Sequence, residues 1–216
     1  MNHLTDFKKY SNSCLETLCK EVETFPWDNA FAYAHWLAQT YYYVSHSTRL
    51  LALGASRFPV AEDVFHQRFL AHAGEEKKHE FLALADLKTM GMEIDTLPEF
   101  SATRSFYQVQ YYWIEHVSPK AFYGYIVMLE GLAVAKARWI ENAVKPHFQQ
   151  NVTRFLTVHA NEDPGHLENA YAFISKLTAN DKQRILLNFD QSLQLYSALL
   201  RQCEQAAQTT ALRKSA

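Results

Sequence analysis

The chain has 216 residues, of which 48% are hydrophobic and 20% charged, which excludes general disorder and allows one well-developed core. The net charge of −2, without a sustained basic run, disfavours a nucleic-acid partner. Glycine and proline are scarce, at six residues each, which favours long helices over a fold of strands and turns.

Seven stretches have sequences compatible with helices, and short breaks separate them. They span residues 3–23, 29–57, 61–90, 103–117, 118–144, 148–177 and 180–208. Asp28 fits an N-cap, Gly91 a C-cap, and Ser118-Pro119 a helix start. Strand patterns, repeats and domain boundaries are absent from the sequence. Residues 1–216 are therefore predicted to form one all-α bundle with a frayed tail over about 209–216.

The cysteines and the hydropathy pattern bear on the compartment. Cys14, Cys19 and Cys203 form neither a CxxC pair nor an even framework, so we expect reduced thiols. The first residues lack the basic start and apolar run of a signal peptide, and no uncharged apolar stretch approaches about 18 residues. We expect a cytoplasmic protein without a membrane span, and a homodimer formed through the aromatic-rich helices is a further expectation.

The stretch 159–166 contains two imidazoles and two carboxylates within helix-forming sequence. Its residues His159, Asp163 and His166 are spaced i, i+4, i+7 and therefore share one face of a helix. The apolar residues Phe155 and Ile174 continue this face, which indicates that it points toward the core. Buried imidazoles and carboxylates need a partner that offsets their desolvation, and a metal ion is one such partner.

Pro164 lies inside this predicted helix, where proline usually costs about 3 kcal/mol. Gly165 beside it adds roughly 1 kcal/mol more. One interpretation is a helix break that places His166 on a loop. The other, which we favour, is a kink that re-aims His159 and Asp163 relative to His166.

The third predicted helix carries a second cluster. His72, Glu76 and His79 are spaced i, i+4, i+7, and Glu76 with His79 forms a Glu-x-x-His pair of the kind used by carboxylate-bridged metal sites in bundles. The alternative is a solvated charged face. For His72 three roles are considered: a metal ligand, a hydrogen-bond donor to a carboxylate, or a histidine of the core. Glu75 is expected to be more exposed to solvent than Glu76.

Glu130 is the only charged residue of the apolar segment 122–135, so its helix is predicted to be central. An ionised carboxylate there is costly unless it is paired or bound to a metal. The alternative is a buried ion pair with an arginine or a histidine. Gly124 and Gly131 indicate close helix packing or room for a ligand.

The candidate metal ligands are carboxylates and imidazoles from three helices, without a thiolate. They are His79, Glu130, His159, Asp163 and His166, with Glu76 or His72 as a sixth. This mixture suits iron or manganese better than zinc, and five or six ligands can hold two metal ions. Tyr42 and His46, one turn apart on the second predicted helix, are candidate catalytic residues that could face the site, although an aromatic face is more often core.

The order of a helix with Glu and His, an isolated Glu130, and then His159-x3-Asp163-x2-His166 resembles the heme-oxygenase-like diiron oxidases and oxygenases. The resemblance implies the seven-helix fold shared with heme oxygenase, thiaminase II of the TENA/THI-4 group and the pyrroloquinoline-quinone synthesis protein C. It also implies iron at the matched positions, and oxidation of a small organic substrate by dioxygen. Several members of that family have a glutamate where this chain has His72.

Together with this resemblance, the residues favour an enzyme that is an iron-dependent oxidase or oxygenase, with one or two iron ions and manganese as the other candidate metal. The alternatives are a cofactorless oxidase like the quinone-synthesis protein, a thiaminase-II-like enzyme, and a non-catalytic ligand-binding protein on the same scaffold. Thiaminase II chemistry needs a reactive cysteine near the pocket, and the three cysteines lie in the terminal helices.

Overall fold

The computed structural model describes residues 6–214, with the side chains of residues 6–209, and the regular structure in this range is helical. The α-helices are α1 (Phe7–Thr24), α2 (Ala30–Val44), α3 (Ser47–Arg57), α4 (Asp63–Glu75), α5 (Glu80–Thr89), α6 (Ser101–Tyr112), α7 (Tyr123–Val144), α8 (Arg154–Ser175) and α9 (Ala179–Lys214). Single turns of tighter or wider helix lie at Val60–Glu62, Ile94–Thr96, Trp113–Val117, Pro119–Phe122 and Lys145–His147. The all-α fold is confirmed. None of these helices is long and apolar enough to cross a membrane.

Two of the seven expected helices are each divided in two. The stretch 29–57 is interrupted at Ser45 and His46, between α2 and α3, and the stretch 61–90 is interrupted at residues 76–79, between α4 and α5. The second interruption includes Lys78 at φ 75°, in the left-handed region. Neither break contains glycine or proline, which explains why the sequence pattern did not reveal them.

The ends of the last two helices also differ from the expectation. α8 begins at Arg154 rather than near residue 148, and α9 continues to Lys214 rather than ending near residue 208. The backbone of residues 209–214 is thus helical, where a frayed tail was expected, while residues 3–5 and 215–216 lie outside the described residues.

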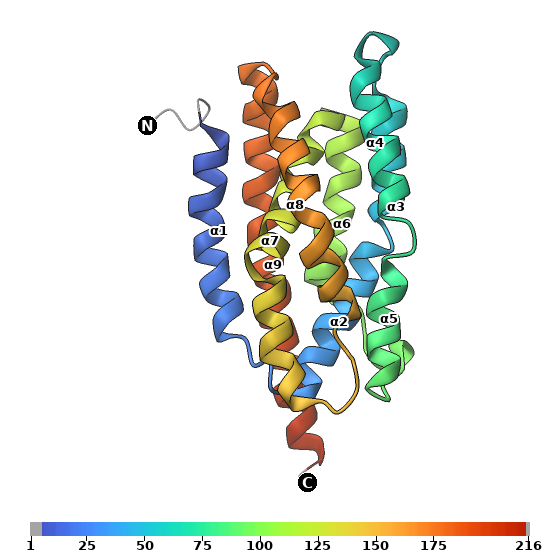
Figure 1. Cartoon of the computed structure of the whole chain (residues 1–216), viewed down its shortest axis with the longest axis vertical. Coiled ribbons are helices and arrows are strands. Elements are labelled where there is room, and N and C mark those ends of the chain that lie inside the picture. The colour runs from blue at the N-terminus through green and yellow to red at the C-terminus, as the bar shows by residue number, and fades with distance from the viewer. Residues whose placement is uncertain (1–5, 215–216) are drawn as a thin grey trace.

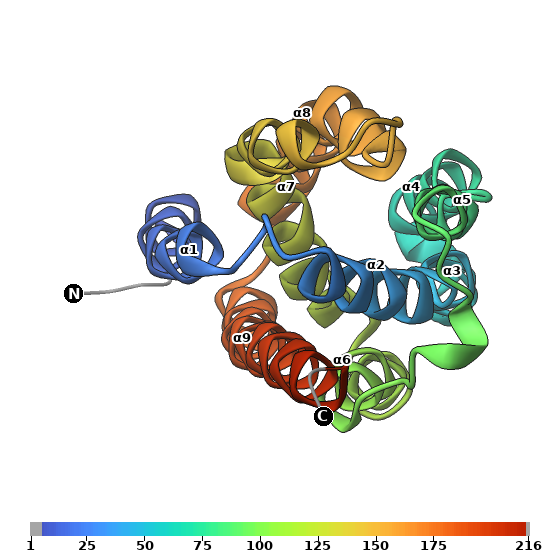
Figure 2. The ribbon, with the colours of Figure 1, turned by 90° about the horizontal axis from the view of Figure 1, so that it is seen from below.

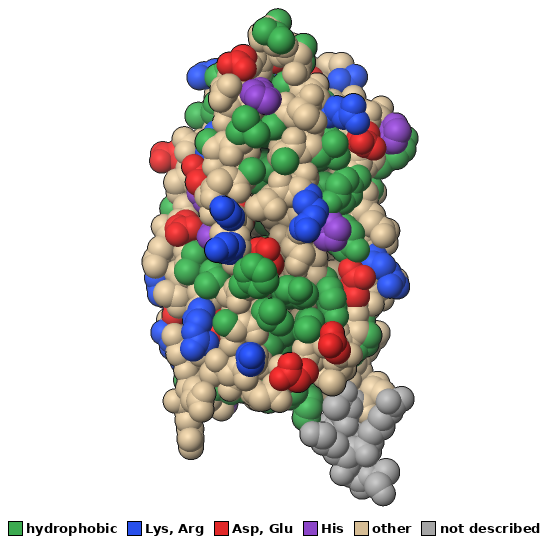
Figure 3. All heavy atoms as spheres, turned by 90° about the vertical axis from the view of Figure 1, so that its right-hand side faces the viewer, with side chains coloured by type: hydrophobic (Ala, Val, Ile, Leu, Met, Phe, Trp, Pro, Cys, Tyr) green, Lys and Arg blue, Asp and Glu red, His purple; other side chains and the backbone are tan. Residues whose placement is uncertain are grey.

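Helix α7 lies in the middle of the bundle, with α1, α8 and α9 packed around it (Figures 1 and 2). Its first half is buried on nearly all sides, as its continuous apolar sequence predicts. Charged side chains of both signs lie among hydrophobic ones on the side of the molecule that includes α4 and α5 (Figure 3). The central position of α7 places Glu130 in the interior.

Gly124 allows α7 and α9 to approach closely. A Cβ atom at this position would meet the carbonyl oxygen of Ile185 and lie 2.5 Å from the backbone nitrogen of Phe189. At Gly131 a Cβ would instead lie 2.6 Å from Cδ1 of Leu15, the mobile end of a side chain on α1. Of the two roles considered for these glycines, the structure shows close helix packing.

A buried carboxylate joins α5 to the start of α8. Asp86, which is fully buried, accepts hydrogen bonds from the backbone N–H of Phe155 and from the guanidinium of Arg154, both at 3.0 Å. Because the first backbone N–H groups of a helix have no partner within it, this contact satisfies one of them. It also positions the helix that carries His159.

Replacing Gly124 by alanine is expected to lower the free energy of unfolding by about 1–3 kcal/mol, because the new methyl group meets backbone that cannot move aside. Gly131→Ala is the matched control. Leu15 can yield there, and the helix gains roughly 1 kcal/mol of propensity, so the net change should be small. Urea unfolding measures the free energy of unfolding of both variants. An equal loss of stability in the two would contradict this account of the helix packing.

Candidate metal centre

Three helical segments bring the predicted ligands together. α4 and the turn after it carry His72, Glu76 and His79, while α7 carries Glu130 and α8 carries the rest. His72, Glu130 and Asp163 are buried, with 5%, 6% and 3% of their surface exposed. The cluster therefore lies inside the bundle, where unpaired charges are costly.

α8 continues through Pro164, and this proline and Gly165 lie on its exposed side. The interpretation in which the helix breaks and His166 lies on a loop is therefore wrong. His159, Asp163 and His166 lie on one continuous helix, as their spacing predicts. The outward position of Pro164 leaves this ligand face uninterrupted.

One half of the cluster consists of Glu76, His79 and His159. Nδ1 of His79 lies 3.4 Å from Oε2 of Glu76. The ring centres of His79 and His159 are 5.1 Å apart. His159 donates a hydrogen bond from Nδ1 to the carbonyl oxygen of Phe155 at 2.9 Å, which leaves Nε2 as its free acceptor. One potential ligand atom from each of the three residues lies within 4.8 Å of the others.

The other half consists of Glu76, Asp163 and His166, whose potential ligand atoms also lie within 4.8 Å of one another. Nδ1 of His166 is 3.7 Å from Oδ1 of Asp163 and 3.9 Å from Oε1 of Glu130. Glu76 thus belongs to both halves, as a carboxylate shared between two metal ions would.

His72 contacts the carboxylates directly. Its Nε2 lies 3.1 Å from Oε1 of Glu130 and 3.7 Å from Oε1 of Glu76. The shorter distance is that of a hydrogen bond, which favours His72 as a donor that orients Glu130. A third triad, His72 with Glu75 and His166, also has its ligand atoms within 4.8 Å.

Glu75 and Glu162 lie at the exposed edge of the cluster. Oε2 of Glu75 is 3.3 Å from Nε2 of His166, and Oε2 of Glu162 is 3.7 Å from Nε2 of His79. Arg68 holds Glu75 through hydrogen bonds of 3.0 and 3.2 Å. Each of the two histidines therefore has one nitrogen toward buried carboxylates and the other toward an exposed carboxylate. This is the arrangement of a metal-binding histidine oriented by an outer carboxylate.

Several buried atoms of the cluster have no hydrogen-bond partner. They are Oε2 of Glu130, Nδ1 of His79 and Nδ1 of His166. Buried polar atoms are nearly always satisfied in native proteins, so three orphans within one cluster require an explanation. A metal ion bound by these atoms would supply it, because carboxylate oxygens and imidazole nitrogens are suitable donors for iron and manganese.

The electrostatics of the cluster show how strongly the groups interact. Burial raises the pKa of Glu130 to about 7, despite the contact with His72. Burial alone would lower the pKa of His72, but Glu130 and Glu76 outweigh it and raise the pKa to about 9. Burial would likewise raise the pKa of Glu76, yet His72 and His79 hold it well below its usual range. The carboxylates thus require nearby positive charge.

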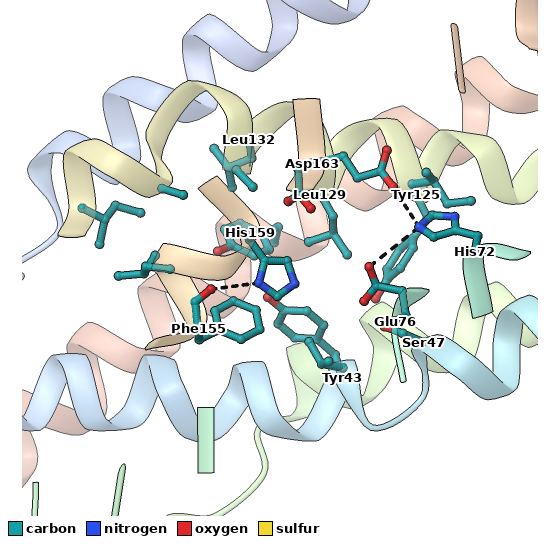
Figure 4. A pocket seen from close by; sticks show the side chains of 18 of the residues that line it. Tyr43, Ser47, His72, Glu76, Tyr125, Leu129, Leu132, Phe155, His159 and Asp163 are labelled. Atoms are coloured by element: carbon teal, nitrogen blue, oxygen red, sulfur yellow. Dashed lines mark hydrogen bonds and ion pairs between the residues drawn. The ribbon is translucent and has the colours of Figure 1, made fainter. Parts of the chain in front are cut away.

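A cavity of about 100 Å³ adjoins the cluster. Five of the predicted ligands lie on its wall, namely His72, Glu76, Glu130, His159 and Asp163. The rest of the wall is largely apolar or aromatic, and includes Leu129, Leu132 and Phe155 (Figure 4). The cavity can therefore hold a small organic molecule directly against the candidate metal ligands.

Tyr42 and His46 do not lie on the wall of this cavity. The Tyr42 hydroxyl donates to the carbonyl oxygen of Leu97 at 2.9 Å, while His46 stacks on Tyr107 and contacts the Tyr111 hydroxyl at 2.8 Å. These contacts direct both side chains elsewhere, in contrast to the expectation that they face the site. Among the residues of the wall that the sequence did not single out are five with a polar side-chain atom, namely Trp36, Tyr43, Ser47, Tyr125 and Tyr196. Helical periodicity cannot tell which aromatic residues face a cavity and which fill the core.

The fold and site define a helical bundle that encloses a cluster of carboxylates and imidazoles next to an apolar cavity. Residues 34–197, more than half of the chain, match the family model of iron-containing redox enzymes, and the chain belongs to that family. The resemblance seen in the sequence is thereby confirmed.

Two solved structures show the same fold. One is a domain of unknown function with a heme oxygenase-like fold from Shewanella denitrificans, 18% identical, with a TM-score of 0.84 and 95% of each chain covered. The other is a TenA homolog from Pseudomonas syringae pv. tomato, 11% identical, with a TM-score of 0.75 and coverage of 94% of this chain and 91% of that one. No curated protein matches the chain.

In metal-free protein, the free energy of unfolding is expected to fall as pH rises from about 5 to about 7. Folded Glu130, with a pKa of about 7, keeps its proton there, whereas the unfolded chain releases it and is favoured as pH rises. The Glu130→Gln variant lacks this carboxyl group. The fall in its free energy of unfolding over the same pH range should therefore be smaller by about 1–3 kcal/mol. Urea unfolding at several pH values with a chelator present measures the difference.

Glu141→Gln is the control for this experiment, because Glu141 is also a buried carboxylate on α7. Its pKa is lowered by Lys145 and Thr157 despite burial, so it does not titrate in the same window. The free energy of unfolding of this variant should fall with pH as steeply as that of the wild type. Parallel curves for the wild type and Glu130→Gln would contradict the assignment.

Proposed function

We propose that the protein is a non-heme diiron oxidase or oxygenase that uses dioxygen to oxidise a small organic molecule. The observation that carries this proposal is the pair of ligand triads that share Glu76, with unsatisfied buried atoms directed into the same cluster. Membership in a family of iron-containing redox enzymes supports iron over manganese, which the same donor types would also accept.

Six side chains would hold the two ions. His79 and His159 would bind one ion and Asp163, Glu130 and His166 the other, with Glu76 shared between them. Three carboxylates would balance most of the charge of two iron(II) ions, and His72 would orient Glu130 through its hydrogen bond. Glu75 and Glu162 would orient His166 and His79 from the exposed side.

Bound iron would supply the reductive activation of dioxygen. The protein's own contribution is position and environment. The cavity holds the substrate next to the side chains of Glu130, His159 and Asp163. The substrate is thus close to the bound metal ions before the reaction begins. Its apolar wall, which includes Leu129 and Leu132, excludes bulk water from the reacting atoms.

The position of the cysteines favours this function over thiaminase-II-like chemistry. Cys14, Cys19 and Cys203 are absent from the cavity wall, and burial raises the pKa of the Cys19 thiol. A buried thiol with a raised pKa is a poor nucleophile. The cavity therefore offers metal ligands but no activated sulfur.

Anaerobic loading with iron(II), followed by removal of excess metal and elemental analysis, is expected to give close to two irons per chain. Glu130→Gln and Asp163→Asn should each retain one iron or fewer, because each removes an anionic donor from the cluster. The loss in affinity should be at least tenfold, since even outer residues of metal sites contribute about 10–100-fold.

Tyr42→Phe and His46→Gln serve as controls, because both residues lie outside the cavity wall and should leave the iron count unchanged. A count near zero in the wild type, with unchanged stability, would overturn the proposal. A count of one in the wild type would retain an iron enzyme and reject the two-metal assignment.

A further inference from the structure

Three tyrosines lie on the cavity wall, Tyr43, Tyr125 and Tyr196, and all are buried. The Tyr196 hydroxyl accepts a hydrogen bond from Nε1 of Trp36 at 3.1 Å and is also bonded to Tyr43. The Tyr125 hydroxyl, in contrast, is buried and has no hydrogen-bond partner. With 2% of its surface exposed, Tyr125 is a polar group in the cavity wall that lacks a partner within the described part of the chain.

An unsatisfied buried hydroxyl is costly, so a hydroxyl in a cavity wall stabilises a bound molecule that offers it an acceptor. Figure 4 shows Tyr125 toward the end of the cavity where His72 and Glu76 lie, and Phe155 and His159 toward the other. A molecule anchored at Tyr125 would thus extend along the candidate ligands.

The remaining wall limits the chemistry of that molecule. It contains neither lysine nor arginine, and its one strongly basic imidazole, His72, already faces Glu130 at 3.1 Å and Glu76 at 3.7 Å. Three carboxylates lie along the same wall, so an anionic group would meet like charge there. Burial raises the pKa of Tyr125 well above its ordinary value, which keeps the phenol neutral and able to donate. The volume of about 100 Å³ corresponds to a molecule of about four to six non-hydrogen atoms, by comparison with cavities that hold benzene.

We propose that Tyr125 is the substrate-anchoring residue of this cavity and donates a hydrogen bond to an uncharged, mostly apolar molecule with one acceptor oxygen, such as a ketone, ester or alcohol. The apolar part of that molecule lies against Leu129 and Leu132, next to Glu130 and Asp163. This inference rests on the proposed function, because it assigns a substrate class to the same cavity. Tyr125 acts by position and specificity, while the iron ligands carry the reaction.

The test compares 2-pentanone with its hydrocarbon isostere 2-methyl-1-pentene, which differ only in the acceptor oxygen. Affinities are measured by titration calorimetry with the iron-loaded protein under anaerobic conditions and with the metal-free protein. A net hydrogen bond of about 0.5–1.5 kcal/mol corresponds to a preference of roughly 2- to 12-fold. The wild type should therefore favour the ketone more strongly than Tyr125→Phe does by that factor, while the alkene binds both equally.

Tyr123→Phe is the matched control. Tyr123 is a neighbouring tyrosine whose hydroxyl is also buried and unpartnered, yet it is absent from the cavity wall. This variant should keep the wild-type preference for the ketone. An unchanged preference in Tyr125→Phe, or the same loss in both variants, would overturn the inference.

A second measurement covers the case in which Tyr125→Phe does not fold. In wild-type protein labelled with ¹³C at the tyrosine ζ carbons, the ketone should shift one buried tyrosine resonance that the alkene leaves unchanged. Equal shifts with both probes would overturn the inference. The iron count separates the two proposals, because anchoring without bound iron rejects only the proposed function, and bound iron without a ketone preference rejects only this inference.

Discussion

The cost of burying carboxylates inside an apolar helix bundle governs the structure. Glu130 lies on the central helix with 6% of its surface exposed, and Asp163 faces it from α8 with 3% exposed. Removing such groups from water costs several kcal/mol each unless opposite charge compensates. His72 satisfies only one oxygen of Glu130 and leaves the other without a partner. The surrounding imidazoles therefore lessen the cost of burial, and a bound cation would complete the compensation.

Contacts remote from the cluster keep its three helical segments in place. Asp86 ties α5 to the first turn of α8, one turn before His159. On the other side of the bundle, Gly124 allows the backbone of α9 to lie directly against α7. Both contacts depend on backbone atoms, which cannot reorient as a long side chain can. Such contacts suit a site that needs donor atoms from different helices within a few ångströms of one another.

The part of the site that follows from helical periodicity could be predicted from the sequence. His159, Asp163 and His166 needed only a continuous helix, and Glu130 only an apolar surrounding sequence. Other features depend on tertiary contacts that leave no local signal. The break at residues 76–79 contains neither glycine nor proline, and Lys78 adopts a positive φ there. Similarly, Tyr42 and Tyr125 are both tyrosines in helices rich in aromatic residues. Only the packed structure separates the one bonded to the Leu97 carbonyl from the one in the cavity wall.

The cluster of candidate metal ligands also lies between two different environments. On its outer side, Glu75 and Glu162 have side chains that are 41% and 48% exposed, and they contact the largely buried imidazoles of His166 and His79. On its inner side the wall is apolar, with Leu129 and Leu132 close to the ligands. The acidic outer side would add to the stabilisation of a cation held by the cluster, whereas an uncharged apolar molecule is stabilised by the cavity wall. A cation would use the carboxylate and imidazole atoms of the cluster and an apolar molecule the apolar wall, so the two would bind without competing for the same atoms.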